Sequence, residues 1–209
     1  EPQSVRDDLI SVYREYAPRI CRHWHLPLQA ASSRMLKAMR RPYDQNTYLR
    51  RLTAVREAVP NTIIGADVIV GFPGETDDDF NRSRRLVEQS GLLDYLHVFS
   101  YSDRPGTRAA DLPDKVAPDV IKERCGMLTE ISDRLRRAAL QRQVGETLEV
   151  ISEHRLRDKN YYWAVADNYL KVKLSAEHYS GRMPLQVWIT RALADHLAGE
   201  PVELPAARG

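Results

Sequence analysis

Strand-like apolar runs alternate with helical patterns through the first 143 residues, and this alternation constrains the fold more than any other feature. The strand-like runs cover residues 20–29, 62–72 and 93–102. The helical patterns cover residues 4–18, 33–41, 43–59, 77–91 and 119–142. Because strands separated by whole helices need crossover connections, we expect a parallel α/β sheet or partial barrel with ligands at the carboxyl ends of its strands.

Beyond Gly145 the pattern changes to short runs of β-forming residues without helices between them. These runs are TLEVIS (147–152), YYWAVAD (161–167), YLKVKL (169–174), LQVWIT (185–190) and PVEL (201–204). Five short strands in about 60 residues match the size of a small β-barrel. The sequence therefore predicts two domains, residues 1–143 and a five-stranded antiparallel barrel over residues 144–209.

Charge and cysteine content restrict the class of protein. The chain has 31 Lys and Arg residues against 29 Asp and Glu residues, so its net charge of +2 is not that of a generally polyanion-binding protein. Its two cysteines and the lack of an apolar export segment are typical of a protein of the reducing cytoplasm. No apolar run reaches about 18 residues, so no membrane span is expected.

The stretch ADVIVGFPGETDDDF ends a strand in a turn of unusual composition. Gly71, Pro73 and Gly74 remove side chains where the backbone bends or approaches a ligand. Glu75 and Asp77 are expected to cap the helix that follows. An ordinary strand-to-helix turn is the alternative, and a phosphate cradle is disfavoured because the glycine and lysine patterns of such loops are missing.

The first strand ends in a histidine-rich and then basic segment. Six basic residues and one acid lie between Arg34 and Arg51, which indicates either an anion-binding surface or a solvated helix face. His23 and His25 are two apart on a strand and so share a face, but no third ligand has a matching spacing, and we expect no metal site. Cys21 and Cys125 are expected to be buried hydrophobes.

Four stretches together carry a family resemblance: CRHWHLPLQAASSRMLKAMRRPY, ADVIVGFPGETDDDF, LHVFSYSDRPGTRAA and DNYLKVKL. In this order and spacing they resemble the second half of the radical S-adenosylmethionine (SAM) methylthiotransferases, most closely those acting on threonylcarbamoyladenosine in tRNA. The resemblance implies the second half of a radical SAM barrel in residues 1–143. It also implies a TRAM domain, the RNA-binding β-barrel of this family, in residues 144–209.

The resemblance also implies a set of cofactor-binding residues. The strand that ends in GFPGE would pass beside the adenine of SAM, the end of HLPLQ would face the SAM and substrate pocket, and a basic residue and the last strand would complete it. The implied residues are His25, Gln29, Ser32, Arg40, Val68, Val70, Gly71, Phe72, Gly74, Glu75, Val98 and Phe99. No residue is predicted to act as a general acid or base, which suits a radical reaction whose chemistry comes from the cofactor.

The family uses two 4Fe-4S clusters held by cysteine thiolates, and those ligands are absent from this chain. Cys21 and Cys125 alone cannot supply the three thiolates that each cluster needs. We therefore expect the chain to be inactive without the N-terminal domain and the other barrel half, and its open barrel edge to favour self-association. Alternatives are a family member that modifies another tRNA adenosine or a ribosomal protein, and a non-catalytic RNA-binding fragment.

The barrel segment has a net charge near zero, but its basic residues are grouped. Arg155, Arg157 and Lys159 precede three aromatic residues, and Lys171 and Lys173 alternate along one strand and share a face. Such a surface suits phosphate contacts and base stacking. The sequence thus predicts binding of a tRNA anticodon stem-loop, with a solvated surface over a core that contains Tyr162 and Trp163 as the alternative.

Overall fold

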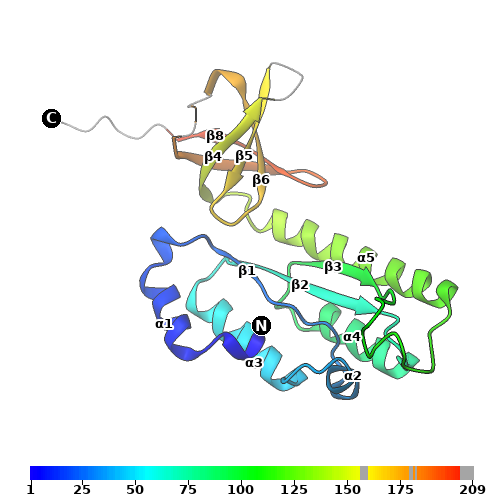
Figure 1. Cartoon of the computed structure of the whole chain (residues 1–209). Coiled ribbons are helices and arrows are strands. Elements are labelled where there is room, and N and C mark those ends of the chain that lie inside the picture. Colours follow the sequence, from blue (N-terminus) through cyan, green and yellow to red (C-terminus); the bar gives the residue numbers. More distant parts are fainter. Residues whose placement is uncertain (156–159, 179–180, 182, 203–209) are drawn as a thin grey trace. The chain divides into compact units, whose positions relative to one another are not determined.

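The computed structural model describes residues 1–155, 160–178, 181 and 183–202 (Figure 1). The chain forms two compact units, each described below by itself. Unit 1 comprises Glu1–Ala17 and Trp24–Leu135, and unit 2 comprises Pro18–His23 and Arg136–Gly209. The chain passes into the second unit at Leu135 and Arg136, inside the last long helix, whereas the sequence predicted a boundary after residue 143.

The first sheet has three strands in the order β1 (His23–His25), β2 (Ile63–Val70) and β3 (Tyr95–Ser100). β2 and β3 are parallel, as expected, with Asp67 opposite His97. β1 is much shorter than the predicted run 20–29, although a parallel bridge between Gln29 and Val68 continues its edge. Pro27 has no N–H to donate, and Gln29 has a φ of 60°, so the regular ladder cannot continue.

The predicted helices are present, with ends shifted by a few residues. They are α1 (Asp7–Glu15), α2 (Ser33–Ala38), α3 (Gln45–Ala58), α4 (Asp77–Gln89) and α5 (Pro118–Gln141), with short 3₁₀ turns η1 (Pro2–Ser4) and η2 (Ala17–Arg19). Asp44 caps α3 by accepting a hydrogen bond of 2.8 Å from the Thr47 backbone N–H. None of the helices in the described ranges is both long and apolar enough to cross a bilayer.

The helices cover one face of the sheet and leave the other more open. Along β2, every second side chain enters the helix-covered core: Ile64, Ala66, Val68 and Val70. Their core partners come from α1, α3, α4 and α5: Ile10, Tyr13, Leu52, Val55, Phe80, Val87, Leu128 and Ile131. Because side chains alternate along a strand, Asp67 and Ile69 lie on the opposite face, which carries the candidate site.

Unit 2 contains a closed barrel. Its strands are β4 (Thr147–Arg155), β5 (Tyr161–Ala166), β6 (Lys171–Ser175), β7 (Leu185–Ala192) and β8 (Leu197–Pro201), with a 3₁₀ turn, η3 (Ala176–His178), after β6. Around the barrel the order is β4-β5-β6-β8-β7. Five strands and closure confirm the predicted barrel.

Two details of the predicted barrel are wrong. β6 and β8 are parallel, so the barrel is not wholly antiparallel. The last strand spans Leu197–Pro201 rather than residues 201–204, of which 203 and 204 lie outside the described part of the chain. Leu197 is fully buried and starts the strand, whereas the apolar run PVEL that suggested it begins where the strand ends.

A short segment from early in the chain belongs to the barrel unit. Within Pro18–His23, Arg22 makes a two-pronged ion pair with Asp167, at 2.6 Å from Nε and 2.9 Å from Nη2. The Arg22 backbone N–H also donates to the Asp167 carbonyl at 2.8 Å. The His23 ring lies 4.7 Å from the Tyr169 ring, centroid to centroid. The barrel unit is therefore discontinuous in sequence.

Candidate functional site

A cavity of about 480 Å³ lies at the carboxyl ends of β2 and β3, where parallel sheets usually bind ligands. It is entirely within unit 1. Its lining combines apolar, polar and cationic side chains. The lining residues are Gln29, Met39, Arg41, Asp67, Ile69, Phe72, Phe99, Ser100, Tyr101, Ser102, Arg104, Thr107 and Ala109.

Aromatic side chains form one wall of this cavity. The Phe72 and Tyr101 rings meet edge to face, with centroids 5.2 Å apart, and Ala30 and Met35 support Phe72 from the buried side. Phe99 is 49% exposed and offers a further ring. Such a wall suits the stacking of a flat heterocycle.

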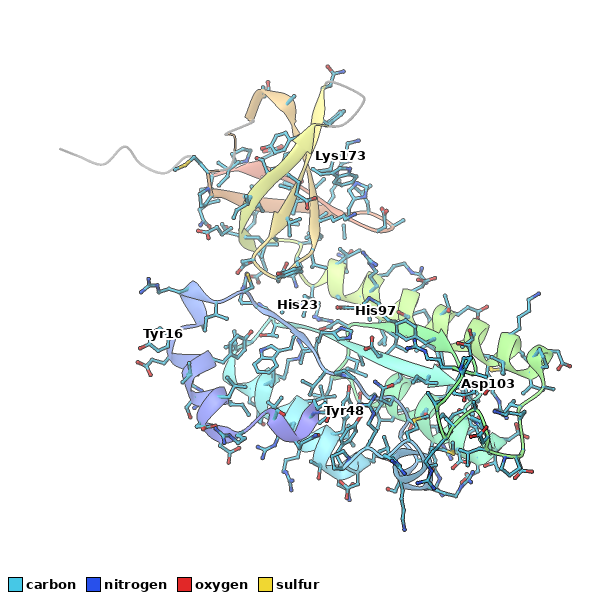
Figure 2. All side chains as sticks on the ribbon, viewed as in Figure 1. Tyr16, His23, Tyr48, His97, Asp103 and Lys173 are labelled. Atoms are coloured by element: carbon cyan, nitrogen blue, oxygen red, sulfur yellow. The ribbon has the colours of Figure 1, made fainter. Side chains whose placement is uncertain are left out.

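Cationic groups lie at the same cavity. Arg41 and Arg104 line it, whereas the predicted Arg40 is exposed and has a φ of 56°. Asp103, labelled in Figure 2, follows β3. It accepts hydrogen bonds from the Tyr101 hydroxyl at 2.9 Å and from the Lys115 ammonium at 2.6 Å. Arg41, the residue after the predicted Arg40, is the one that lines the cavity, and the cofactor role of Arg40 stays a prediction.

The Gly71–Gly74 turn is held from below by a buried carboxylate. Glu75 accepts hydrogen bonds from the Gly71 backbone N–H and from Arg124, both at 2.8 Å. Burial raises the pKa of Glu75, and the Gly71 and Arg124 hydrogen bonds oppose that rise. Gly71 has a φ of 82°, and a Cβ there would lie 2.4 Å from the Ile121 side chain, so a larger residue fits neither the backbone nor the space.

The helix after this turn is capped by other residues than expected. Thr76 and Asp79 form a capping box at the start of α4, whereas Glu75 holds the turn and Asp77 pairs with Arg124 at 2.6 Å. Asp79 also accepts from Ser32 at 2.5 Å and from Arg34. Ser32, predicted near the cofactor, therefore ties the start of α2 to the start of α4.

Not all of the predicted cofactor residues lie on the cavity side. Gln29, Phe72 and Phe99 line the cavity, but Val68 and Val70 are buried in the helix-covered core, and Val98 packs against it. Their side chains point to the opposite face, so any contact with a ligand would involve their backbone. The predicted cofactor roles stay predictions. The cavity-facing neighbours are Asp67, Ile69 and Phe99, which strict alternation along the strands would have selected.

Three titratable side chains from three strands meet on this open face. His25 Nε2 lies 2.8 Å from Asp67 Oδ1, and His97 Nδ1 lies 3.4 Å from the same oxygen. His23, which was expected to share a face with His25, belongs to unit 2 and contacts Tyr169 of that same unit. Figure 2 shows His97 on β3. Register between β2 and β3, which the sequence does not reveal, is what brings Asp67 and His97 together.

The two cysteines have different surroundings. Cys125 is half-buried in α5, and burial raises the pKa of its thiol. Cys21 is exposed, so the expectation that both cysteines are buried is wrong for Cys21. It lies in the short irregular stretch before β1, where apolar neighbours in the sequence do not ensure burial.

On the barrel, basic and aromatic side chains share the outer surface of β5 and β6. Lys173 Nζ lies 4.1 Å from the centre of the Tyr161 ring, and Lys171 is exposed on the same side of β6. The Trp163 ring packs edge to face on His196, 4.9 Å between centroids. Tyr162 is fully buried.

The predicted RNA-binding residues are only partly described. Lys171 and Lys173 lie on the surface that carries Tyr161 and Trp163. Arg157, Lys159 and the side chain of Arg155 lie outside the described part of the chain.

Comparison with known proteins gives matches along nearly the whole chain. Residues 2–87 match the radical SAM superfamily. The chain is 39% identical over 210 residues to the tRNA-2-methylthio-N(6)-dimethylallyladenosine synthase of Clavibacter michiganensis, covering 97% of this chain and 39% of that protein. It is 43% identical over 150 residues to the same-named enzyme of Kineococcus radiotolerans, covering 72% of this chain and 29% of that protein. The chain thus spans well under half the length of these relatives.

A solved structure agrees on the fold. Coproporphyrinogen III oxidase from Escherichia coli, a radical SAM enzyme, aligns with a TM-score of 0.51 at 17% identity, covering 98% of this chain and 50% of that one. At this identity the likeness concerns the fold alone. The sequence matches are thus to the radical SAM superfamily and to tRNA methylthiotransferases, and the structural match is to a radical SAM fold.

Proposed function

We propose that this chain is the SAM- and RNA-handling part of a tRNA methylthiotransferase that acts on an N6-modified adenosine. The observation that carries the proposal is the 39% identity over 97% of the chain to an enzyme named for that reaction. Similarity of this extent covers both the sheet and the barrel, so it concerns their combination and not a common fold alone. The chain covers 39% of that relative, so the activity is proposed for the whole protein.

The cavity residues suit SAM and a target adenosine. The ring edges of Phe72 and Tyr101 and the exposed Phe99 ring can contact a purine, and Arg41 and Arg104 can pair with carboxylate or phosphate groups. Gln29, 7% exposed and at the cavity wall, offers an amide for hydrogen bonds. Bound SAM would supply the radical chemistry, while these side chains would orient the purine and keep water away.

The residues of this chain do not fit an iron–sulfur cluster. Cys21 and Cys125 are its only thiols, fewer than a cluster with one open iron requires, and Cys125 has a raised pKa that disfavours the thiolate. The proposed 4Fe-4S clusters would therefore take their ligands from outside these 209 residues. By itself the chain is proposed to be inactive, and self-association through its open sheet edge stays a prediction.

The barrel is proposed to be a TRAM domain that binds tRNA near the anticodon. Support comes from the outer surface of β5 and β6, where Lys171 and Lys173 lie beside the aromatic rings of Tyr161 and Trp163. Cations beside exposed rings suit an RNA backbone with unstacked bases. A non-catalytic RNA-binding protein is the second candidate, and this surface is the observation that favours it. In either case the protein would act in the cytoplasm, where tRNA is found.

The N6 substituent of the adenosine separates two versions of the proposal. The sequence resemblance favours a threonylcarbamoyl group, whereas the relatives are named for a dimethylallyl group. We propose an N6-modified adenosine as the substrate class, and the names of the relatives favour the dimethylallyl form. A third version, a ribosomal-protein substrate, has no support among these relatives.

One experiment tests the activity and the substituent together. The gene that encodes this chain is deleted in its source organism, and the nucleosides of total tRNA are separated and weighed by mass spectrometry. We expect one 2-methylthio nucleoside to disappear and its precursor to accumulate, and the mass of the precursor identifies the substituent. Unchanged levels of all methylthio nucleosides would contradict the proposed activity. The non-catalytic RNA-binding protein would then be the favoured function.

A further inference from the structure

The open face of the sheet carries a cluster of three titratable side chains, His25, Asp67 and His97, to which the proposed function gives no metal-binding role. Their possible ligand atoms, one from each residue, all lie within 4.8 Å of one another. The side chains are 31%, 24% and 56% exposed, so a solute can reach them. We propose that this cluster binds a divalent transition-metal ion, such as Zn²⁺ or Fe²⁺.

The distances suit such an ion. Bonds of 2.0–2.2 Å from nitrogen and oxygen place the donors of a tetrahedral site about 3.3 Å apart. Asp67 Oδ1 lies 2.8 Å from His25 Nε2 and 3.4 Å from His97 Nδ1, so small side-chain rotations would centre an ion between the three. Two imidazoles and one carboxylate are donors that Zn²⁺ and Fe²⁺ accept, and three protein ligands leave positions open.

The backbone fixes these ligands in place. Asp67 and His97 are directly opposite in the parallel pairing of β2 with β3. His25 is held beside them because the Leu26 N–H donates to the Gly65 carbonyl at 2.9 Å and the Leu28 N–H donates to the Asp67 carbonyl at 3.1 Å. Ligands on adjacent strands of one sheet are better positioned than ligands on loops.

A further residue orients one of the imidazoles. The Tyr95 hydroxyl lies 3.4 Å from His25 Nδ1, while Nε2 of that ring faces Asp67. Contact with the second ring nitrogen is the arrangement that metal-binding histidines commonly have. Tyr95 can reach His25 because Gly65 has no side chain, since a Cβ there would lie 2.1 Å from the Tyr95 ring.

The cluster adjoins the cavity through Asp67, which belongs to both. Open positions of a bound ion would therefore be accessible to a ligand in that cavity. Anionic oxygen donors are the ligand class that fits, because Arg104 lines the cavity together with Arg41, whose guanidinium pairs with Glu1. The inference does not depend on the reaction proposed above, and a loss of methylthiolation would say nothing about it.

The test uses the 209-residue chain without an affinity tag, titrated with Co²⁺, whose visible absorption reports coordination by protein ligands. We expect one ion per chain with the spectrum of a site of four or five ligands, displaced by Zn²⁺. His97→Ala and Asp67→Asn should each weaken Co²⁺ binding at least about tenfold, as loss of one of three ligands implies. X-ray absorption of the Zn²⁺ form should show nitrogen and oxygen neighbours without sulfur.

The control is a matched histidine substitution in the barrel unit. His196→Ala removes a half-buried imidazole from this unit and should leave Co²⁺ affinity within about twofold. Circular dichroism checks each variant, and His25→Gln replaces His25→Ala if the latter unfolds. A cluster that is only a hydrogen-bonded triad predicts equal, weak Co²⁺ binding in all variants, and that result would overturn the proposal.

Discussion

The two faces of the three-stranded sheet are built from neighbouring residues, yet one face is apolar and buried and the other is polar and accessible. Val68, on the covered face, is 1% exposed among the apolar side chains of four helices. Asp67, one position earlier, is accessible and pairs with two imidazoles. Because the side-chain period of a strand is two, a single chain segment provides a core and a polar site at once. The first of four predictions tests how separate these two faces are, and the other three extend the comparison to a helix start, two glycines and the barrel surface.

The largest effect is expected from a charge on the covered face. Val68→Asp places a carboxylate in the apolar core and should lower the free energy of unfolding of unit 1 by about 4 kcal/mol or more. Phe99→Asp on the open face should cost only about 1 kcal/mol, because that side chain is 49% exposed. Urea unfolding followed by circular dichroism compares the two. Similar losses would mean that the open face is covered in solution.

The Asp79 network at the start of α4 should give the next largest effect. Burial acts to raise the pKa of Asp79, but hydrogen bonds from Ser32, Thr76 and Arg34 outweigh it and hold the pKa well below its usual value. A lowered folded-state pKa stabilises the fold above the unfolded-state pKa of about 4 and loses that contribution as the pH falls further.

Asp79→Asn should therefore lower the free energy of unfolding by about 2 kcal/mol at pH 7. Unfolding curves at pH 7 and pH 3 check the sign, because the difference between the wild-type chain and the variant should shrink at pH 3. A difference that grows on acidification would show that the carboxylate does not stabilise this helix start.

A pair of glycine substitutions should have effects of opposite sign. Gly65→Ala forces the Tyr95 ring away, since the new Cβ would lie 2.1 Å from it, and should cost about 1–2 kcal/mol. Gly126→Ala in α5 meets nothing within 4 Å and should stabilise the helix by about 0.5–1 kcal/mol. Thermal unfolding measures both. A neutral Gly65→Ala would mean that Tyr95 does not depend on this close approach.

The smallest effect on stability is expected on the barrel surface. Reversing Lys171 and Lys173 to Glu should change the free energy of unfolding by less than about 1 kcal/mol, because both lie outside the core and the Lys173 contact with Tyr161 is a weak surface interaction. The same double variant should bind an anticodon stem-loop about tenfold or more weakly at low salt.

Fluorescence anisotropy at several salt concentrations measures this binding. Lys122→Glu with Arg137→Glu makes the same change in net charge on exposed positions of α5 and should have a much smaller effect. Equal losses in the two double variants would show a response to overall charge and no defined RNA surface.

Local sequence patterns predicted the order of elements well, because helical periodicity and β-forming runs are properties of a few neighbouring residues. The positions of α3, α4 and β2 agree with the patterns within a few residues. Features that depend on pairing between distant segments were missed. The parallel contact of β6 with β8 and the meeting of Asp67 with His97 both depend on strand register, which no local pattern encodes.

The site implied by the sequence and the cavity overlap in part. The turn that ends β2 does form part of the cavity end of the sheet, where Phe72 lies. The family resemblance implied Val68, Val70 and Val98, whose side chains lie on the covered face, whereas the cavity face is the more polar one. Thr76 caps the helix instead of Glu75, because the Glu75 carboxylate pairs with the buried Arg124 at the turn.

The ion pair between Arg22 and Asp167 has a consequence for how such proteins evolve. It places Pro18–His23 in the barrel unit, so the chain crosses between its units after Ala17, after His23 and after Leu135. A domain attached by one linker can be exchanged between genes by recombination at a single point. This barrel carries six residues that are encoded more than a hundred positions before the rest of it. Recombination at one point would separate Arg22 from Asp167, which favours inheritance of the sheet and the barrel as a pair.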